Sequence, residues 1–378
     1  MRIAHFLPGR CNPDSANGVE KVVYNLTRQL ATLNHQVALF SLTAKPPIPI
    51  PGVDVLAYPP ERIPFMLPQN LLYDLRGWRP DIVHLHSVYS PWNAALAAWL
   101  VRNRIPYVVT PHGGLSPHVS RRRWYLKTPY KWLFELRCHN RAAFVHAVSQ
   151  HEAGDIQVYG VQRPIEVIPN GFDTKQLPAD LDRTLLRSRF PQTEGKRVLA
   201  FLGRLDPYHK GLDLFLEGLA AAKTTQVCAV LIGPDWHNGR YRLEKIAKDL
   251  GISDRVLFAG SIYGAEKYQL LSGADIFVHT SRWEGLPLAV LEACAVGLPC
   301  LVTPAANPNN QLEKYHAGQI VSPVPTQIAQ SISAFQGLSQ EELRELGQQA
   351  RRMIEVEFSW TKSSQDISRA YQTHACPN

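Results

Sequence analysis

Short apolar runs alternate with amphipathic segments along the whole chain. In the first half, runs typical of buried strands occur at residues 3–7, 37–42, 81–86, 107–110, 144–149 and 165–169. Between them lie segments such as 18–30, whose valine and leucine residues recur at helical spacing and predict a helix with one buried face. Strands that alternate with helices are typical of a parallel sheet covered by helices.

The second half repeats this pattern. Its strand-like runs are residues 198–203, 227–233, 256–258, 276–280 and 299–303. A chain of 378 residues is also too long for one ordinary hydrophobic core. We therefore predict an α/β protein with two doubly wound domains, formed by residues 1–176 and 197–357, and a polar linker at 177–196.

Residues 45–68 interrupt the alternation. This stretch is rich in proline, which lacks the backbone N–H that a central strand needs. We expect it to form an extended loop at the surface.

Composition narrows the class of protein. Apolar residues make up 45% and charged residues 19% of the chain, which is typical of a globular protein. No apolar run approaches the ~18 residues of a membrane span, and Pro8 and Arg10 interrupt any secretory signal. The six cysteines show no metal-binding spacing, so reduced thiols in a cytoplasm are the simplest interpretation.

Almost all of the formal net charge of +8 belongs to residues 1–180, which indicates an anionic partner for the first half. Residues 118–141 interleave aromatic residues with cations, and the candidate membrane or acceptor contacts are Arg121, Arg122, Arg123, Trp124, Lys127 and Lys131. Such a segment fits a helix on an anionic membrane surface. A solvated helix with inward-facing aromatics is the equal alternative. No recognised nucleic-acid module accompanies it, so we expect no nucleic-acid partner.

Residues 281–297 (SRWEGLPLAVLEACAVG) carry the most specific pattern. They follow a strand-like run and turn at Glu284, and Pro287 stands where a helix would begin. That helix is apolar on every face except at Glu292, whose charge needs a partner. Both acids can border a crevice at the carboxyl end of a strand, where a helix start suits a phosphate and carboxylates suit sugar and ribose hydroxyls. A solvated turn acid and a buried ion-pair member are the alternatives.

A second motif spans residues 201–212 (FLGRLDPYHKGL). The strand ends at Gly203, and Arg204 and Lys210 follow in a glycine-bracketed loop before a helix. Two cations near a helix start are what a diphosphate leaving group requires, because negative charge grows as its bond breaks. An ordinary basic surface loop is the alternative.

Two loops of the first half hold further candidates. Asn17 and Gly18 follow the first strand, and His112 stands in a TPHGG loop at the end of another. His86 ends the strand HLH, where we expect it to be exposed and near an acceptor, with His84 packed inside. The two histidines alone do not make a metal site.

The two motifs of the second half resemble the E-x7-E signature and the GR…KG loop of retaining, nucleotide-sugar-dependent glycosyltransferases of family 4. The resemblance covers nearly the whole chain. It implies the GT-B fold, in which two Rossmann-like domains face a central cleft. It also implies that residues 358–378 form a helix that crosses back onto the first domain.

The resemblance assigns roles to individual residues. It implies that Glu284 holds the donor sugar, that Glu292 holds the nucleotide ribose, and that His112 contacts the sugar from the first domain. The residues implied at the donor phosphates are Asn17, Gly18, Gly203, Arg204, Lys210, Gly285, Leu286 and Pro287. It implies no metal and no cofactor besides the nucleoside diphosphate sugar.

This chain departs from the family pattern at two places. Asn17 stands where the family usually has glycine, and residues 304–309 (PAANPN) replace a loop that usually reads Gly-Gly and then Glu. Asn tolerates unusual backbone angles, so the first departure is mild. The second lies near the donor phosphates in relatives, and it can change donor choice or affinity.

We therefore expect a retaining glycosyltransferase that moves a sugar from a nucleoside diphosphate donor to an acceptor. A lipid-linked saccharide or glycolipid of surface polysaccharide assembly fits the basic segment, at the cytoplasmic face of a membrane. A nicotinamide-dependent dehydrogenase is disfavoured because the chain contains no GxG. A glycosidase that uses the two glutamates would leave the phosphate loop unexplained. A non-catalytic sugar- or lipid-binding scaffold is the remaining alternative.

Overall fold

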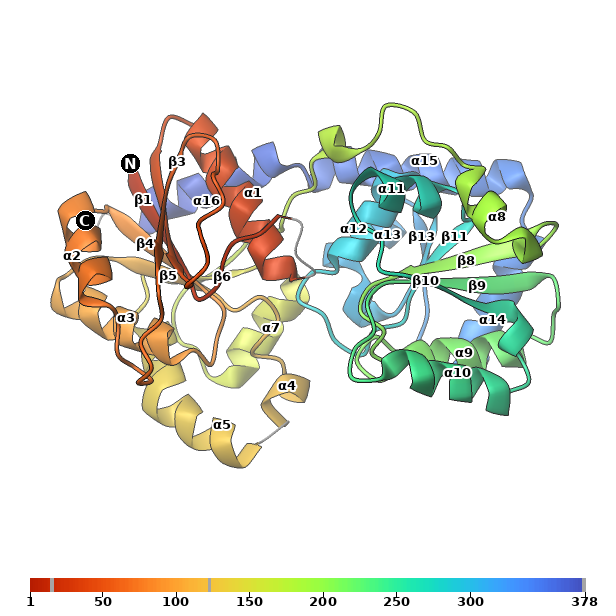
Figure 1. Cartoon of the computed structure of the whole chain (residues 1–378), viewed down its shortest axis with the longest axis horizontal. Helices are drawn as coiled ribbons and strands as arrows, with labels where there is room; N and C mark the ends of the chain where they lie inside the picture. Colours follow the sequence, from red (N-terminus) through yellow and green to blue (C-terminus); the bar gives the residue numbers. More distant parts are fainter. Residues whose placement is uncertain (14–16, 122–123, 376–378) are drawn as a thin grey trace. The chain divides into compact units, whose positions relative to one another are not determined.

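The structure is a computed structural model that describes residues 1–13, 17–121 and 124–375. The chain divides into two compact units: unit 1 holds Met1–Gly171 and Trp360–Asn378, and unit 2 holds Phe172–Ser359. Each unit is built on one parallel sheet with helices on both faces (Figure 1). Among the described residues, no helix combines the length and the apolar character that crossing a bilayer requires.

The sheet of unit 1 has the strand order β3-β2-β1-β4-β5-β6-β7. Its strands are β1 (Arg2–Leu7), β2 (Gln36–Leu42), β3 (Val53–Tyr58), β4 (Ile82–His86), β5 (Tyr107–Thr110), β6 (Phe144–Ala147) and β7 (Ile165–Val167). Every ladder among these strands is parallel. The order reverses between β1 and β4, which is the switch point where such sheets bind ligands.

Helices cover both faces of this sheet. They are α1 (Gly18–Thr32), α2 (Gln69–Trp78), α3 (Pro91–Arg102), α4 (Pro117–Arg121), α5 (Trp124–Tyr130), a π-helix (Lys131–Glu135), α6 (Leu136–Asn140), α7 (Gln150–Tyr159) and α16 (Trp360–Ala375). Because successive strand residues point to opposite faces, Phe6 packs in the core with α2 and α3, whereas Leu7 packs in the core with α1. Helix α16 lies against α1.

The expectation that residues 45–68 form a loop is wrong. Strand β3 lies within this stretch and pairs with β2, with Val53 opposite Val37. The prolines lie before Gly52 and after Tyr58, so no missing N–H falls inside the strand. Proline therefore marks the ends of this edge strand, where it is tolerated.

The sheet of unit 2 has the order β10-β9-β8-β11-β12-β13, and all of its ladders are parallel. Its strands are β8 (Arg197–Leu202), β9 (Val227–Ile232), β10 (Val256–Gly260), β11 (Ile276–His279), β12 (Cys300–Val302) and β13 (Gly318–Ile320). Strand β13 has only three residues (GQI) and contains no apolar run, so the sequence analysis did not predict it. The order reverses between β8 and β11.

Figure 1 shows α9, α10 and α14 on one face of this sheet and α11, α12 and α15 on the other. The helices are α8 (Leu185–Arg189), α9 (Leu212–Ala221), α10 (Gly239–Asp249), α11 (Gly264–Ser272), α12 (Leu288–Ala295), α13 (Gln311–Lys314), α14 (Pro325–Gly337) and α15 (Gln340–Glu357). Single 3-10 turns lie at Thr174–Gln176, Pro191–Thr193, Ser253–Arg255, Pro304–Ala306 and Pro308–Asn310.

Residues 177–196, expected as a polar linker, contain a helix that packs into unit 2. Helix α8 contacts α11, and its Leu186 is fully buried. A Cβ atom at Gly273 would lie 2.7 Å from the Leu186 Cβ atom, so the helix and the chain after α11 are in close contact.

Helix α12, which carries Glu292, is held in place by a close approach to α15. A Cβ atom added at Gly347 of α15 would lie 2.1 Å from the carbonyl oxygen of Gly297, just after α12. Only glycine allows this separation, so α15 fixes the depth at which α12 lies against the sheet.

We predict that Gly347→Ala lowers the free energy of unfolding by about 1–3 kcal/mol, because the added methyl group must displace backbone. Gly337→Ala is the matched control, since a Cβ atom there meets open space. It should change the free energy by less than about 0.5 kcal/mol. Urea unfolding of both full-length variants checks this, and equal values for the two would contradict the packing.

Candidate active site

Two loops of unit 2 meet at the switch point of its sheet. The loop after β8 begins at Gly203, and the loop after β11 begins at Thr280. The two strands are direct neighbours, so both loops leave the carboxyl edge of the sheet side by side. Gly211 has φ +62°, and a Cβ atom there would lie 1.9 Å from the Thr280 carbonyl oxygen. The two motifs found in the sequence are therefore in direct backbone contact.

Side chains fasten the loops further. The ring of His209 stacks on Trp283 with centroids 4.3 Å apart, and its Nε2 lies 3.1 Å from the Trp283 carbonyl oxygen. Arg282 pairs with both carboxylate oxygens of Asp213, at 2.8 and 2.9 Å. His209, to which the sequence assigned no role, thus joins one motif to the other.

The carboxylate of Glu284 lies at the centre of this arrangement. Its Oε1 atom accepts hydrogen bonds from Lys210 Nζ at 2.6 Å, Ser281 Oγ at 2.7 Å and His279 Nε2 at 3.0 Å. Its Oε2 atom accepts none from the residues that the structure describes. One oxygen therefore fixes the side chain, and the other is available to a ligand.

Electrostatics keep Glu284 ionised. Burial alone would raise its pKa, but the Lys210 ammonium, with the hydrogen bond from His279, holds the pKa well below its ordinary value. An ionised carboxylate accepts hydrogen bonds and cannot donate a proton. This arrangement suits the binding of a hydroxyl group and opposes a role as general acid.

Arg204 provides a second cation at the carboxyl edge of the sheet. Its guanidinium lies over the ring of Trp236, 4.3 Å from the centroid. No acidic side chain among the described residues pairs with it. The stacked, planar group is therefore available for an anion.

Glu292 has the partner that its burial requires. Its Oε2 atom lies 2.9 Å from Lys267 Nζ, and both side chains are almost buried. Lys267 comes from α11, and its ammonium also lies over the ring of Tyr268 at 4.3 Å. The buried ion pair that the sequence allowed as an alternative is thus present, and Oε1 makes no ion pair with the described residues.

Helix α12 begins beside Glu284. The sequence predicted Pro287 at the start of this helix. In the structure Pro287 is the N-cap, with φ −77° and ψ 95°, and the helix begins one residue later. The Leu288 and Ala289 amides have no acceptor within the helix, which leaves N–H groups at this end. With Gly285 and Leu286 in the turn before them, they form a site suited to phosphate oxygens.

In unit 1, His112 occupies a strained turn after β5. Its φ of +54° is unusual for a residue with a side chain, and Gly113 follows at +76°. The carboxylate of Glu152 accepts hydrogen bonds from the N–H groups of Gly113 and Val148 and holds the turn in place. Burial raises the pKa of Glu152 to about 7.

Asn17, which stands where the family usually has glycine, has ordinary backbone angles. Its φ is −84°, and its side chain caps α1 by accepting the Val19 N–H at 3.1 Å. Gly18 is the first residue of that helix. The asparagine is therefore explained by helix capping.

The expectation that His86 is exposed is wrong. His84 and His86 are both fully buried in β4, beside His5 of β1. Within the described residues, these three form the one group of metal-ligating type, with nitrogens within 4.8 Å of each other. However, both nitrogens of His84 already bond to hydroxyl groups, Tyr371 at 2.6 Å and Thr110 at 2.5 Å.

The basic segment differs from a simple cationic surface. Arg122 and Arg123 lie outside the described residues, and Arg121 ends α4. Lys127 Nζ bonds to the Val119 carbonyl at 2.5 Å, and Lys131 lies 4.2 Å from the Tyr159 ring. Burial lowers the pKa of Lys131. These two lysines therefore serve internal contacts.

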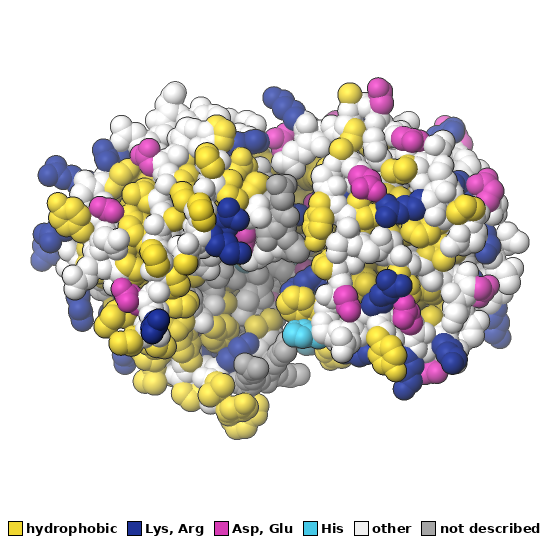
Figure 2. Space-filling model, viewed as in Figure 1, with side chains coloured by type: hydrophobic (Ala, Val, Ile, Leu, Met, Phe, Trp, Pro, Cys, Tyr) yellow, Lys and Arg dark blue, Asp and Glu magenta, His cyan; other side chains and the backbone are white. Residues whose placement is uncertain are grey.

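Aromatic and aliphatic side chains instead dominate the exposed surface here. Trp124 and Trp132 are 66% and 65% exposed, and Phe65 from a separate loop contacts Phe134 with ring centroids 4.5 Å apart. The apolar patch consists of Ile63, Phe65, Met66, Trp124, Tyr125, Leu126, Trp132, Leu133 and Phe134. Figure 2 shows hydrophobic side chains gathered at the lower end of unit 1, around α5.

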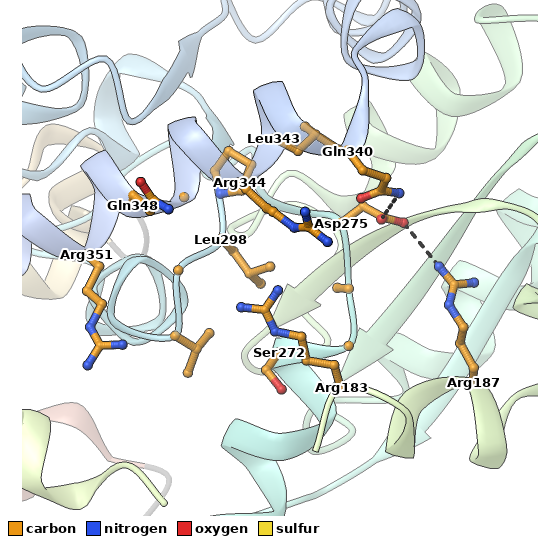
Figure 3. Close-up of a pocket in the computed structure, with 16 residues that line it drawn as sticks. Arg183, Arg187, Ser272, Asp275, Leu298, Gln340, Leu343, Arg344, Gln348 and Arg351 are labelled. Atoms are coloured by element: carbon orange, nitrogen blue, oxygen red, sulfur yellow. Dashed lines mark hydrogen bonds and ion pairs between the residues drawn. The ribbon is translucent and has the colours of Figure 1, made fainter. Parts of the chain in front are cut away.

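A cavity of about 510 Å³ lies at the opposite, amino-terminal edge of the unit 2 sheet (Figure 3). Its acidic residue, Asp275, pairs with Arg187 and Arg197 at 3.5 Å each and accepts the Val198 N–H at 2.7 Å. These contacts tie α8 to the sheet. The residues just before β11 and β12 line the cavity, so it is separate from the loops around Glu284.

Comparisons with known proteins identify the family of the chain. The family profile described as Glycosyltransferase Family 4 matches residues 16–176, and the profile described as Glycosyl transferases group 1 matches residues 182–353. The chain belongs to the GT-B glycosyltransferases of the family 4 type. The predicted family and α/β fold class are thereby confirmed.

Among relatives, a UDP-Gal:alpha-D-GlcNAc-diphosphoundecaprenol alpha-1,3-galactosyltransferase of Escherichia coli is 31% identical over 250 residues, covering 64% of this chain and 62% of the relative. A GDP-mannose-dependent alpha-mannosyltransferase of Mycobacterium tuberculosis is 27% identical over 256 residues, covering 67% and 63%. The chain therefore matches less than two-thirds of the length of these family 4 relatives.

Solved structures show the same fold. Sucrose-phosphate synthase from Thermosynechococcus elongatus superposes with a TM-score of 0.79 at 19% identity, covering 98% of each chain. Anabaena HepE in complex with UDP and glucose superposes with a TM-score of 0.77 at 21% identity, covering 99% of this chain and 100% of HepE. At these identities the likeness concerns the fold alone.

We predict that Lys210→Met lowers the free energy of unfolding by about 3–5 kcal/mol, because it leaves the buried Glu284 charge without its ammonium partner. Adding Glu284→Gln should restore part of the loss. Lys314→Met is the control, since that lysine is 62% exposed in its pair with Glu357 and should cost less than about 1 kcal/mol. Denaturant unfolding at neutral pH measures all four proteins. A loss for Lys210→Met no larger than the control's would contradict the central role of the pair.

The same pair predicts a pH dependence. The pKa of Glu284 lies below its ordinary value of 4.5 in the folded protein, so the unfolded state binds the proton more tightly. The stabilisation is therefore present above about pH 4.5 and is lost as the pH falls towards the folded pKa. The Lys210→Met/Glu284→Gln variant should lose less stability than the wild type between pH 5 and 3, and an identical slope would refute the assignment.

Proposed function

We propose that this protein is a retaining glycosyltransferase that moves a sugar from a nucleoside diphosphate donor to an acceptor hydroxyl. One observation carries the proposal: an ionised carboxylate, two cations and a helix N-terminus converge at the switch point of one sheet. The family and the activities in the names of the relatives support it.

The donor diphosphate would be held by positive groups that differ in kind. Arg204 offers a planar guanidinium that stacks on Trp236 and has no acidic partner in the described part of the chain. Lys210 offers an ammonium whose position is fixed by Glu284. The amides around Gly285, Leu286 and the start of α12 add N–H donors. Together they would stabilise the charge that grows on the leaving phosphate as the glycosidic bond breaks, without a metal ion.

The two glutamates would bind hydroxyl groups. Glu284 keeps Oε2 available for a hydroxyl of the donor sugar, because its other oxygen is fully engaged. Glu292 would accept a hydrogen bond from the ribose through Oε1, while its Oε2 atom contacts Lys267. A glycosidase needs one protonated carboxylic acid, and the pairing of both acids with lysines opposes that use.

Two considerations support retention: the resemblance to retaining enzymes, and the pairing of the carboxylate at the sugar. An inverting reaction needs a base opposite the leaving group, and the one carboxylate here at the sugar is paired with Lys210. In the proposed step the acceptor hydroxyl attacks on the face that the phosphate leaves. Its proton passes to a phosphate oxygen, so the products are the glycoside and the nucleoside diphosphate. His112 would contact the sugar.

For the acceptor we propose a lipid-linked saccharide or glycolipid at the cytoplasmic face of a membrane. The name of the Escherichia coli relative includes a diphosphoundecaprenol substrate. The apolar patch of unit 1 supports the same setting, because side chains of this size on a surface are suited to the interfacial region of a bilayer. A scaffold that binds sugar or lipid without catalysis is the alternative.

Transfer assays test the function directly. The full-length protein is incubated with UDP-, GDP- and ADP-linked sugars and a membrane lipid extract as acceptor source. We expect one donor class to release nucleoside diphosphate, with Arg204→Ala lowering kcat about 100-fold or more through the lost phosphate contact. Arg240→Ala, which removes an exposed arginine paired with Glu244, is the matched control and should retain activity.

The configuration of the new bond, read by NMR of the product, should match that of the donor sugar. Inversion would contradict the retaining mechanism. Nucleotide binding by the wild type without turnover on any acceptor fraction would favour the scaffold.

We predict that Trp124→Ser/Trp132→Ser lowers binding to anionic lipid vesicles at least tenfold, because each indole buries a large apolar area. Lys127→Gln should have a smaller effect, since this lysine is engaged internally. Tyr73→Ser, at an 80% exposed aromatic on α2 outside the patch, is the control. Vesicle sedimentation measures each variant. Unchanged binding of the double tryptophan variant would reject the membrane assignment.

A further inference from the structure

Next to the switch point of unit 1, buried side chains form two hydrogen-bonded series, here called the first and the second chain. The first contains imidazole and hydroxyl groups, and the second contains imidazoles. Strands β1 and β4 run side by side there, with His5 opposite His84 and His86 two residues further on. These side chains point to one face of the sheet, where Tyr371 of α16 reaches them. The members of the two chains are His5, His84, His86, Thr110, His112, His146 and Tyr371.

The proton positions of the first chain follow from its fixed end. His146 Nε2 lies 2.7 Å from the Ile168 carbonyl, which only accepts, so Nε2 carries the proton. His146 Nδ1 then accepts from the Thr110 hydroxyl at 2.8 Å. Thr110 has no second proton and accepts from His84 Nε2, so His84 Nδ1 accepts from the Tyr371 hydroxyl at 2.6 Å. Every member of this chain is satisfied in one arrangement.

The second chain consists of three histidines in series. His112 Nε2 lies 3.1 Å from His86 Nδ1, and His86 Nε2 lies 3.0 Å from His5 Nδ1. The inner end, His5 Nε2, is buried and has no partner among the described residues. At the outer end, His112 Nδ1 makes no hydrogen bond with the described residues, and the residue is half-buried. This nitrogen is therefore available to a ligand.

Each of these three imidazoles carries a single proton at neutral pH. Burial lowers the pKa of His5 and of His112 to about 3, and it lowers that of His86 well below its ordinary value. With one proton per ring, the series has two arrangements. Either every ring is protonated on Nδ1, or every ring is protonated on Nε2, because each hydrogen bond needs one donor and one acceptor.

The buried end selects between these arrangements. Protonation on Nε2 would leave an N–H of His5 buried without an acceptor, which is rare in folded proteins. Protonation on Nδ1 avoids this, since His5 then donates to His86 and His86 donates to His112. His112 Nδ1 consequently carries a proton that none of the described residues accepts.

We propose that His5 and His86 are positioning residues that hold His112 as the Nδ1–H tautomer, so that it offers a hydrogen-bond donor to an oxygen of the bound substrate. The positioning role rests on the proposed function, in which His112 contacts the sugar. The strained turn at His112, with φ +54°, fits a residue whose orientation is maintained by its surroundings. A metal ion held by His5, His84 and His86 would instead break the bond of His84 to Thr110 or to Tyr371.

The tautomers are observable directly. We would label the full-length protein with ¹⁵N-histidine and record long-range ¹H–¹⁵N correlations near pH 7.5, assigning each ring by substitution. Protonation on Nδ1 is expected for His5, His86 and His112, and protonation on Nε2 for His84 and His146. His139 is an internal reference for Nδ1–H, because its Nδ1 bonds to the Glu135 carbonyl at 2.9 Å. An Nε2–H signal for His112 would overturn the proposal without any substitution in the series.

The effect on catalysis is tested by His5→Leu. This change removes the donor to His86, and we expect the Nδ1–H signal of His112 to be lost or mixed. The value of kcat should fall about tenfold, the worth of one hydrogen bond to the substrate, with little change in the unfolding midpoint beyond that of the control.

His139→Leu is the matched control. Like His5, His139 is fully buried and has an Nε2 atom without a partner, but it bonds to a carbonyl and not to another imidazole. It should leave the His112 signals and kcat unchanged. An unchanged His112 tautomer in folded His5→Leu would overturn the proposal. Full transfer activity in His112→Ala would remove the substrate contact and with it the positioning role, while Arg204→Ala tests the proposed function separately.

Discussion

A carboxylate removed from water has to be compensated, and the Glu284 side chain meets this requirement with donors from three places. Lys210 reaches it from the loop after β8, His279 from the end of β11 and Ser281 from the turn itself. Because all three use one oxygen, the charge joins both loops while its second oxygen stays available. The positions of the cation, the acid and the start of α12 are thus interdependent, and a ligand can exploit all of them at once.

The sheets set where this can happen. In a parallel sheet the loops at the carboxyl edge diverge to opposite faces only at the switch point, and there two loops can flank a ligand. Unit 2 has its charged loops at β8 and β11, and unit 1 has its buried histidines at β1 and β4. Close backbone approaches reinforce the arrangement: Gly211 lies against Thr280, and Gly347 lies against Gly297. Space requires glycine at residues 211 and 347, and at Gly211 the φ of +62° requires it as well.

Sequence reasoning predicted the α/β class, most strands and both motifs around Arg204 and Glu284, because buried parallel strands are continuous apolar runs and loop motifs are local. It missed β3, whose prolines lie at its ends, and β13, which is short and polar. It also missed Trp236 and Lys267, since they meet Arg204 and Glu292 only through the fold. We expected His86 at an exposed strand end, yet it is fully buried between His5 of β1 and the turn at His112. Such contacts between distant segments have no local signature.

We propose that the two loops of unit 2 form a single diphosphate site organised by Glu284. A crystal structure of the full-length protein with the nucleoside diphosphate that binds most tightly tests this most directly. We expect phosphate oxygens within hydrogen-bond distance of the Arg204 guanidinium, the Lys210 ammonium and the amides before α12, with the ribose at Glu292. A nucleotide bound elsewhere, or bound here with its phosphates directed away from Arg204 and Lys210, would contradict it.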